Sequence, residues 1–537
     1  MKDNKKRLKN FLLITPALTT EAPTNLGMLA SVLKEEGFSV FTAVNTFKHP
    51  LFMDDYVSVV KNNKIDIVGI SMLTIQVLEV YALIKTLKNL GCVVIVGGAH
   101  ATDVPEEPLR FGADIVVRGE GEETLRELCK YWREEIKLSD INGITFYDQD
   151  NKVISTPSRC RVNISKLPQP DFEIFQQDLF KTDEGLLKGF HRIYTSRGCP
   201  GRCTFCDWSV FGQGVQFDEI PTVMKEIQRR VKEYGITSFT IADDCFTTNQ
   251  KRVEKFCEEI VKINPPVIWR CVSRASLVNE EMLRTMKEAG CHSIGFGLES
   301  GDQDTLIRIK KGVKLEHNQK SPKLATAVGL QVFGCLMTGF PWEKPENVEN
   351  TIKLVRELWD AVYLFQISGA LTPFPGTAIY QEFADQYGFK EYWLKPEFQL
   401  RGDQTYQNST NPYKTSTFYQ RNLFDDTYIQ EEIFFTYSRE YKEKVTELVF
   451  TIGLHNLESL YPKNKLKRQG IMFLSKISWV VYKYFPNLEK KIFGRILHPR
   501  AGKRSKVEGL RDRKRGFVKN KKDVTIRTRI KNTNPNV

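Results

Sequence analysis

The sequence predicts an α/β protein made of two successive β/α domains followed by a mostly helical region. Short runs of β-branched and aliphatic residues alternate with helical patterns over residues 1–140, and the alternation starts again over residues 191–385. The apolar strand runs, such as residues 65–70, are nearly continuous, as expected for parallel strands that helices cover on both faces. The length of 537 residues also exceeds that of one ordinary domain.

Residues 1–140 are predicted to form a doubly wound, Rossmann-like domain. Helical patterns at 26–36 and 76–89 lie between strand candidates, with Gly37 and Gly91 where these helices should end. The expected strands are 11–15, 39–43, 65–71, 92–97 and 114–117.

Three segments follow strands of this domain, at the sheet edge where such folds bind ligands. They are Ser71–Thr74, Gly97-Gly98-Ala99-His100 and Gly119-Glu120-Gly121-Glu122. Their glycines would let a ligand approach the backbone, but glycines serve equally well in plain turns. Taken alone, these segments favour the turn interpretation.

Residues 141–190 are predicted to be a linker, with a hairpin at 148–151 and a proline-rich stretch at 167–171. Residues 191–385 form the second domain. Its expected strands are 192–196, 238–242, 267–272, 293–298, 330–337 and 362–368, and its expected helices are 220–234, 250–263, 279–289, 303–310 and 346–358. Six β/α units indicate a partial (β/α)6 barrel, whose chemistry should lie on the loops that follow the strands.

The C-terminal part contains no motif that indicates a chemistry. Residues 386–500 are aromatic-rich and expected to be mostly helical, and residues 501–537 form a basic tail expected to be disordered. From Arg500 on, fourteen Lys and Arg stand against three acidic residues, so the tail carries most of the net charge of +13. The rest of the chain therefore shows no electrostatic signature of nucleic-acid binding.

Apolar residues between Ile471 and Tyr484 recur at helical spacing. The favoured interpretation is a helix packed on its own domain. The alternative is an interfacial helix that, together with the basic tail, makes peripheral contact with an anionic membrane face.

The chain is expected to be cytoplasmic. No apolar run is long enough to span a bilayer, and no secretory signal follows the basic N-terminus. The chain has eleven cysteines, an odd number, which in this setting indicates reduced thiols or metal ligands rather than a disulfide framework.

Three cysteines, Cys199, Cys203 and Cys206, lie within eight residues directly after the first strand of the second domain. Thiolates are the usual ligands of iron–sulfur clusters, and a cubane needs four ligands. Three cysteines on one loop would leave one iron open for chemistry. A zinc site or an electron-transfer ferredoxin site would need a fourth ligand, for which His191 and His100 are poorly spaced.

The Cys-x3-Cys-x2-Cys loop resembles the signature of the radical S-adenosylmethionine (SAM) superfamily. With the domain in front of it, the chain is similar to the subfamily that carries a cobalamin-binding domain, over about residues 10 to 385. That subfamily includes methyltransferases acting on unreactive carbon or phosphorus and the anaerobic magnesium-protoporphyrin ester cyclase. The resemblance implies a 4Fe-4S cluster on Cys199, Cys203 and Cys206 that cleaves SAM to a 5′-deoxyadenosyl radical.

Further elements at successive strand ends match the subfamily's SAM contacts. By resemblance, Phe205 would pack beside the adenine, and Asp243 and Asp244 would meet the ammonium group. The alternative role of these two aspartates is to cap the next helix. Arg274 would pair with the SAM carboxylate or with Glu299, and Glu299 would contact the methionyl or ribose part.

Gly339 matches an element whose backbone lies near the adenine, although Trp342 stands where the family has glycine. The first domain lacks the Asp-x-His-x-x-Gly motif that supplies a histidine to cobalt, as many radical members do. His49 and His100 are interpreted as surface or turn residues. The residues that the resemblance assigns to cobalamin are Ser71, Thr74, Gly97, Gly98, Gly119 and Glu120.

The resemblance thus implies a radical SAM enzyme, with cobalamin-dependent methylation of an unactivated carbon as the leading function. A radical oxidoreductase or cyclase without net methyl transfer is the alternative, and a non-catalytic metal-binding or electron-transfer module is the alternative from another class. The expected partners are a small-molecule substrate and an electron donor such as flavodoxin or ferredoxin. The options for the substrate include a hydrophobic molecule.

Overall fold

The computed structural model describes residues 8–19, 21–46, 49–181, 187, 189–395 and 434–460. The chain divides into two compact units, Met1–Asn456 and Leu457–Val537, and both predicted domains lie in the first. The apolar segment from Ile471 to Tyr484 and the basic tail fall outside the described residues. Among the helices of the described ranges, none has the length and apolar character needed to cross a membrane.

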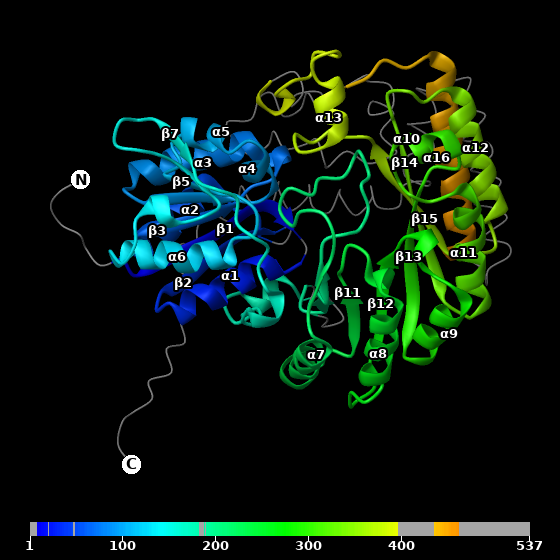
Figure 1. The fold of residues 1–537 in the computed structure, drawn as a ribbon, viewed down its shortest axis with the longest axis horizontal. Coiled ribbons are helices and arrows are strands. Elements are labelled where there is room, and N and C mark those ends of the chain that lie inside the picture. Colours follow the sequence, from blue (N-terminus) through cyan, green and yellow to red (C-terminus); the bar gives the residue numbers. More distant parts are fainter. Residues whose placement is uncertain are drawn as a thin grey trace, which may run out of the picture. The chain divides into compact units, whose positions relative to one another are not determined.

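The first domain contains a seven-stranded sheet in the order β2-β1-β3-β4-β5-β6-β7. Its first five strands are parallel, and they are β1 (Asn10–Thr19), β2 (Ser39–Thr46), β3 (Ile67–Ser71), β4 (Val93–Gly97) and β5 (Ile115–Val117). The helices between and after them are α1 (Thr24–Glu35), α2 (Met53–Asn62), α3 (Val77–Asn89), α4 (Ala99–Asp103), α5 (Glu106–Arg110) and α6 (Glu122–Trp132). This is the predicted doubly wound fold, drawn in blue and cyan in Figure 1.

Both faces of this sheet are buried, which explains why its strands are nearly continuous apolar runs. Along β1, Leu12 and Ile14 pack in one hydrophobic cluster with α2 and α3. Phe11 and Leu13 point the other way and pack in a second cluster with α1 and α6. Successive side chains of a strand face opposite sides, so one strand contributes to both cores.

The predicted linker contributes two strands to this sheet. Its hairpin forms β6 (Ile144–Tyr147) and β7 (Val153–Ser155), and β6 pairs antiparallel with β5. The first sheet therefore extends beyond residue 140 and is mixed rather than wholly parallel. Strands of four and three residues are too short to be distinguished from a free hairpin by sequence pattern.

The second domain contains a six-stranded parallel sheet in the order β15-β14-β13-β12-β11-β8, which matches the predicted partial barrel. Its strands are β8 (Arg192–Ile193), β11 (Ser238–Ile241), β12 (Ile268–Ser273), β13 (Cys291–Glu299), β14 (Gln331–Thr338) and β15 (Leu364–Ala370). Its helices are α7 (Ile220–Tyr234), α8 (Gln250–Ile260), α9 (Glu280–Glu288), α10 (Gln303–Arg308), α11 (Leu315–Ala327), α12 (Pro345–Glu357) and α13 (Ala378–Phe383). Sequence patterning missed α11, which is polar and contains Pro322.

The first predicted strand of the barrel is interrupted. After β8 the chain turns away into β9 (Ser196–Arg197), which pairs antiparallel with β10 (Gln216–Phe217). At this break, Thr195 and Ser196 donate both their backbone N–H groups and their hydroxyls to the carboxylate of Asp243. Residues 198–215, which include the three cysteines, form the loop between β9 and β10.

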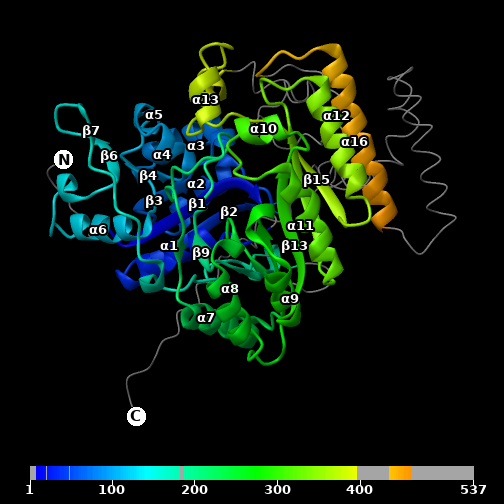
Figure 2. The ribbon, with the colours of Figure 1, turned by 45° about the vertical axis from the view of Figure 1, so that its right-hand side comes forward.

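The last described helix, α16 (Arg439–Leu460), packs beside α12. Both views show α16 in orange next to α12 (Figures 1 and 2), and Lys444 of α16 pairs with Glu349 of α12 at 2.6 Å. Asn456 donates to the carbonyl of Phe365 at 2.8 Å and accepts from its N–H at 2.9 Å. At Phe365 the edge strand β15 thus has hydrogen-bond partners outside the sheet, which hinders pairing with another chain at this residue.

Candidate active site

The cysteine loop is closed at its base by short backbone contacts. Gly198 has a φ of +84°, and a Cβ there would lie 2.4 Å from the carbonyl oxygen of Gly214, so only glycine fits. The N–H of Gly198 donates to Asp244 at 3.1 Å. The N–H of Gly214 donates to the carbonyl of Cys199 at 3.3 Å, which joins the two ends of the loop.

The three cysteines lie together on this loop, but they contact different neighbours. The Cys203 and Cys206 thiols hydrogen-bond to each other, whereas Cys199 hydrogen-bonds to Cys245, which follows β11. In the part of the chain that the structure describes, no group of three or more His, Cys, Asp or Glu side chains is arranged as a metal site. The hydrogen bond from Cys245, the N–H of Gly201 and the charge of Arg274 hold the pKa of Cys199 below its usual range, although burial opposes them.

Two cations border the cysteine loop. The Nη1 of Arg274 lies 3.6 Å from the Cys203 sulfur, and Gly201 leaves room for it, since a Cβ there would lie 2.2 Å from that nitrogen. The pKa of Cys203 is lowered most by the hydrogen bond from Cys206. The charges of Lys311 and Arg274 lower it further. Three thiols on one loop, with nearby cations to offset thiolate charge, fit an iron–sulfur cluster.

Glu299 pairs with Lys311, a residue that the sequence analysis did not identify. The Lys311 Nζ lies 2.6 Å from the Glu299 carboxylate, and both side chains are more than nine-tenths buried. Arg274 therefore does not take the role of partner to Glu299, which was one of its two expected roles. Lys311 follows α10 rather than a strand, so its position gave no signal in the sequence.

The two aspartates after β11 have different surroundings. Asp243 is buried and accepts four hydrogen bonds from Thr195 and Ser196, at distances of 2.6 to 3.1 Å. Asp244 accepts from Gly198 and lines the cavity described below. Neither aspartate caps α8, because Asn249 takes that position and accepts from the N–H of Arg252. Asp243 thus positions the strand before the cysteines.

Two tyrosines at and just before the start of α16 hold the Gly339 turn, although the sequence shows no motif in this region. Gly339 donates its N–H to the Tyr441 hydroxyl and to Glu343, both at 2.8 Å, and its carbonyl accepts from Tyr437 at 2.6 Å. The Tyr441 hydroxyl donates to Glu343 at 2.7 Å. Burial raises the pKa of Glu343 to about 7, against the lowering effect of these hydrogen bonds.

Aromatic rings connect the cysteine loop to this turn. The rings of Phe205 and Phe340 lie 6.0 Å apart, and Phe340 stacks on Trp342 at 5.5 Å and 12°. Trp342 also lies 5.7 Å from the guanidinium of Arg308. The departure from the family's glycine therefore adds a stacked ring to the turn that holds Gly339.

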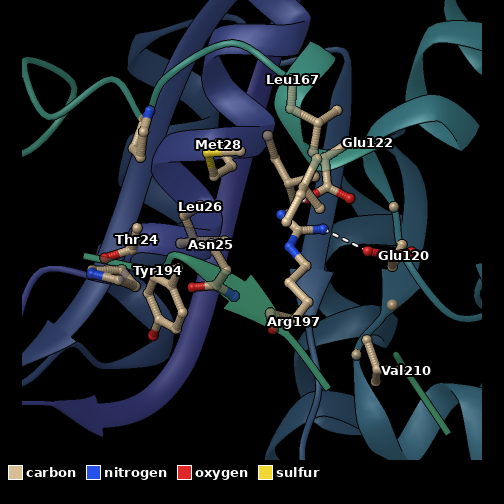
Figure 3. A pocket seen from close by; sticks show the side chains of 18 of the residues that line it. Thr24, Asn25, Leu26, Met28, Glu120, Glu122, Leu167, Tyr194, Arg197 and Val210 are labelled. Carbon is tan, nitrogen blue, oxygen red and sulfur yellow. Dashed lines mark hydrogen bonds and ion pairs between the residues drawn. The ribbon is translucent and has the colours of Figure 1, made fainter. Parts of the chain in front are cut away.

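A cavity of about 770 Å³ lies at the carboxyl edge of the first sheet. It is bordered on one side by Ser71, Gly97, Gly98, Gly119 and Glu120, all predicted ligand contacts. Figure 3 shows Leu26 and Met28 of α1 on another side, with Tyr194, Arg197 and Val210 from the barrel domain closing it. The cavity is therefore shared by the two domains.

The turn after β4, which borders the cavity, needs glycine at position 98. Gly98 has a φ of +104°, and a Cβ there would lie 2.7 Å from the carbonyl oxygen of Met72. Glu120 differs from the expected free ligand contact, because its carboxylate pairs with Arg197 at 2.7 Å and accepts from the N–H of Val162 at 2.9 Å. Thr74, the remaining predicted contact, is buried and hydrogen-bonds to His100 at 3.1 Å.

His100 is fully buried, so its interpretation as a surface or turn residue is wrong. One ring nitrogen contacts Thr74, and the other lies 3.2 Å from Glu107. Glu107 also accepts hydrogen bonds from Tyr81 and, at 3.1 Å, from the Trp393 indole. Burial opposes the charge of Glu107, but His100 and Tyr81 lower its pKa on balance. Both nitrogens of His100 are thus engaged within the protein.

Comparison with known proteins agrees with this architecture. The radical SAM superfamily matches residues 193–355, and the B12 binding domain matches residues 12–129. The uncharacterized methyltransferase PH0819 of Pyrococcus horikoshii is 34% identical over 369 residues, which span 68% of this chain and 78% of that protein. The chain therefore belongs to the radical SAM superfamily, in the group whose members carry a B12 binding domain.

Other relatives include the anaerobic magnesium-protoporphyrin IX monomethyl ester cyclase of Rubrivivax gelatinosus, 26% identical over 408 residues and 71% of each chain. The cobalamin-dependent SAM radical enzyme OxsB with aqua-cobalamin bound has the same fold. Its TM-score is 0.62 at 21% identity, over 92% of this chain and 75% of that one. The methyltransferase TsrM of Kitasatospora setae has a TM-score of 0.59 at 22% identity, over 71% of this chain and 76% of that one.

The predicted family, fold class and enzymatic character are thereby confirmed. The chain is a radical SAM enzyme with a B12 binding domain, and its cofactors are a 4Fe-4S cluster, SAM and cobalamin. The non-catalytic module is set aside. The assignment of individual residues to each cofactor rests on the geometry above and is developed as a proposal.

Proposed function

We propose that this enzyme methylates an unactivated carbon of a small molecule, using the cysteine loop and the sheet-edge cavity as two parts of one site. The observation that carries the proposal is that Arg197, Val210 and Asp244, which lie at or near the cysteine loop, also line the cavity. When bound, the cluster and SAM supply a 5′-deoxyadenosyl radical, and cobalamin supplies the methyl carrier. Adjacent sites allow radical formation and methyl delivery at one substrate carbon.

Cys199, Cys203 and Cys206 are proposed to hold the cluster. Arg274 contacts the Cys203 sulfur, and the charges of Arg274 and Lys311 offset negative charge on the loop. Cys203 is 4% exposed, whereas Cys199 and Cys206 are partly exposed, so the loop shields one of the three proposed ligands from water.

SAM is proposed to bind between the cysteine loop and the Gly339 turn. Phe205 and the Gly339 backbone would contact the adenine, and the Glu299–Lys311 pair would contact the methionyl or ribose part. Asp244 remains the candidate for the SAM ammonium group. Asp243 is assigned a positioning role instead, since its two oxygens already accept four hydrogen bonds.

Cobalamin is proposed to occupy the sheet-edge cavity. Gly97, Gly98 and Gly119 leave backbone exposed to a large ligand, and Ser71 adds a hydroxyl. The residues that line the cavity include no histidine, and His100 is engaged by Thr74 and Glu107. Cobalamin is therefore expected to bind without a histidine ligand from this domain.

The partners are a small-molecule substrate and an electron donor such as flavodoxin or ferredoxin, which reduces the cluster. Peripheral membrane contact through residues 465–537 stays a prediction, as that segment lies outside the described residues. The cytoplasmic location likewise stays a prediction from the sequence.

The test is an anaerobic assay of protein produced with cobalamin and reconstituted with iron and sulfide. Methyl-labelled SAM, a reductant and a small-molecule extract are supplied. Methyl transfer through cobalamin predicts 5′-deoxyadenosine together with S-adenosylhomocysteine and a labelled product. The Cys203→Ala variant should make no 5′-deoxyadenosine. Absence of 5′-deoxyadenosine and of the labelled product from the wild-type assay would contradict the proposal.

The cyclase remains a second candidate, because the Rubrivivax gelatinosus relative aligns over 408 residues. A cyclase would yield 5′-deoxyadenosine without S-adenosylhomocysteine and without label in the product. The same assay therefore separates the two functions.

A further inference from the structure

The Gly119–Glu122 loop after β5 directs two carboxylates at one guanidinium. Arg197 donates from Nη1 to Glu120 and from Nη2 to Glu122, both at 2.7 Å. The side chains of Arg197, Glu120 and Glu122 are 13%, 3% and 8% exposed. Figure 3 shows the guanidinium between the two glutamates. Charges this well shielded from water interact strongly and are costly to separate.

Both ends of this contact are anchored. On the first domain, the N–H of Gly119 donates to the Thr102 hydroxyl at 3.0 Å, and Glu120 accepts from the N–H of Val162 at 2.9 Å. On the barrel, the carbonyl of Arg197 accepts from Arg161 at 2.9 Å. A shift of the Gly119–Glu122 loop must therefore move Arg197 or break its two ion pairs with Glu120 and Glu122, which together are called the fork.

Arg197 is also the last strand residue before the cysteine loop. The N–H of Gly198, the next residue, donates to Asp244 at 3.1 Å, and Cys199 follows immediately. Displacement of the Arg197 backbone would thus change the start of the loop that carries the cluster ligands. Gly119, Glu120, Glu122, Arg197 and Asp244 all line the sheet-edge cavity, so a ligand there meets the same residues.

We propose that Arg197 is a positioning residue that couples the two cofactor sites: cobalamin in the cavity stabilises the cysteine loop in its cluster-binding arrangement, and the cluster strengthens cobalamin binding. The inference rests on the proposed placement of cobalamin and the cluster. Coupling between two sites is reciprocal, so each ligand must raise the affinity of the other by the same factor. Lysine cannot replace the planar fork that reaches both carboxylates, so Arg197→Lys should lose the coupling while keeping the charge.

The experiment measures the affinity of full-length protein for hydroxocobalamin under anaerobic conditions, before and after reconstitution of the cluster. The wild type is expected to bind hydroxocobalamin on the order of tenfold more tightly with the cluster than without it. Arg197→Lys should bring this ratio close to one. Glu122→Gln, which removes the charge from one of the two carboxylates that Arg197 contacts, should give an intermediate ratio.

The matched control is Arg126→Lys, because Arg126 also joins more than one glutamate, namely Glu35, Glu36 and Glu123, but all within the first domain. Its ratio should equal that of the wild type. A second readout is the electron paramagnetic resonance spectrum of the reduced cluster, which hydroxocobalamin should alter in the wild type and not in Arg197→Lys.

The outcomes separate the coupling from the proposed function. Wild-type protein that binds no hydroxocobalamin in either state, or that takes up no cluster, would overturn the proposed sites themselves. Hydroxocobalamin binding that is equally tight with and without the cluster would overturn the coupling alone. A ratio that persists in both Arg197→Lys and Glu122→Gln would show that another contact carries the coupling and would also overturn the inference.

Discussion

Tyr441→Phe should weaken the Gly339 turn in a pH-dependent way. The substitution removes one hydroxyl, which donates to Glu343 at 2.7 Å and accepts from the Gly339 N–H at 2.8 Å. Glu343 would keep the two backbone N–H donors of Gly339 and Phe340. Because the site is buried and its acceptor is a carboxylate, we expect a loss of about 2 kcal/mol in the free energy of unfolding when Glu343 is ionised.

The pH dependence follows from the pKa of Glu343. Burial raises this pKa from 4.5 to about 7, so the folded protein binds the proton more tightly than the unfolded chain does. The contribution of this group to stability is therefore full below pH 4.5 and falls by about 3 kcal/mol as the pH rises to 7. The Tyr441 hydroxyl lowers this pKa, so its removal should raise the pKa further and extend the loss above pH 7.

Urea denaturation followed by far-ultraviolet circular dichroism at pH 6 and pH 8 measures the effect. The destabilisation should be larger at pH 8, and the affinity for SAM should fall as well, since the turn is the proposed adenine contact. Tyr387→Phe is the matched control, because Tyr387 is 38% exposed and packs on Phe435 through its ring. An effect of equal size at both pH values, or none at all, would show that the hydroxyl does not hold Glu343.

Three further substitutions test the site. Lys311→Met leaves the buried carboxylate of Glu299 unpaired and should cost about 3–5 kcal/mol of stability, measured by urea denaturation; Lys311→Arg should recover part of the loss. Asp243→Asn removes a charged acceptor of four hydrogen bonds and should reduce iron bound after reconstitution severalfold; unchanged iron content would argue against its positioning role. Gly98→Ala forces a side chain into a φ of +104° and a 2.7 Å contact, so its hydroxocobalamin affinity should fall at least tenfold, while Gly37→Ala, which meets open space, controls for backbone strain alone.

Local patterns in the sequence were sufficient to predict the parallel strands of both sheets and the cysteine loop. Strand periodicity and helix-ending glycines depend on neighbouring residues, so they are readable without knowledge of the fold. The helix at Ile220–Tyr234 was predicted with its observed bounds, and Gly235 ends it in a left-handed conformation. The elements that were not predicted also reflect their own local sequence. A three-residue strand such as β7 and a polar, proline-containing helix such as α11 carry too weak a pattern to predict.

Partners across long stretches of sequence could not be predicted. The sequence suggested that Asp243 contacts SAM or caps a helix. Only the fold showed that it accepts hydrogen bonds from Ser196 and Thr195, which lie 47 and 48 positions earlier. The Gly339 turn depends on Tyr441, 102 residues later. No residue spacing indicates such contacts, because the strands and helices between them decide which loops meet.

The sequence by itself determined the two β/α domains, the three-cysteine loop and the cofactors that the family implies, since each depends on residues adjacent in the chain. Only the tertiary structure decided that Lys311 rather than Arg274 pairs with Glu299, that His100 is buried, and that Glu120 belongs to the fork on Arg197. The physical reason is that a buried charge must find its partner within a few ångströms in space, and distance along the chain does not constrain that choice.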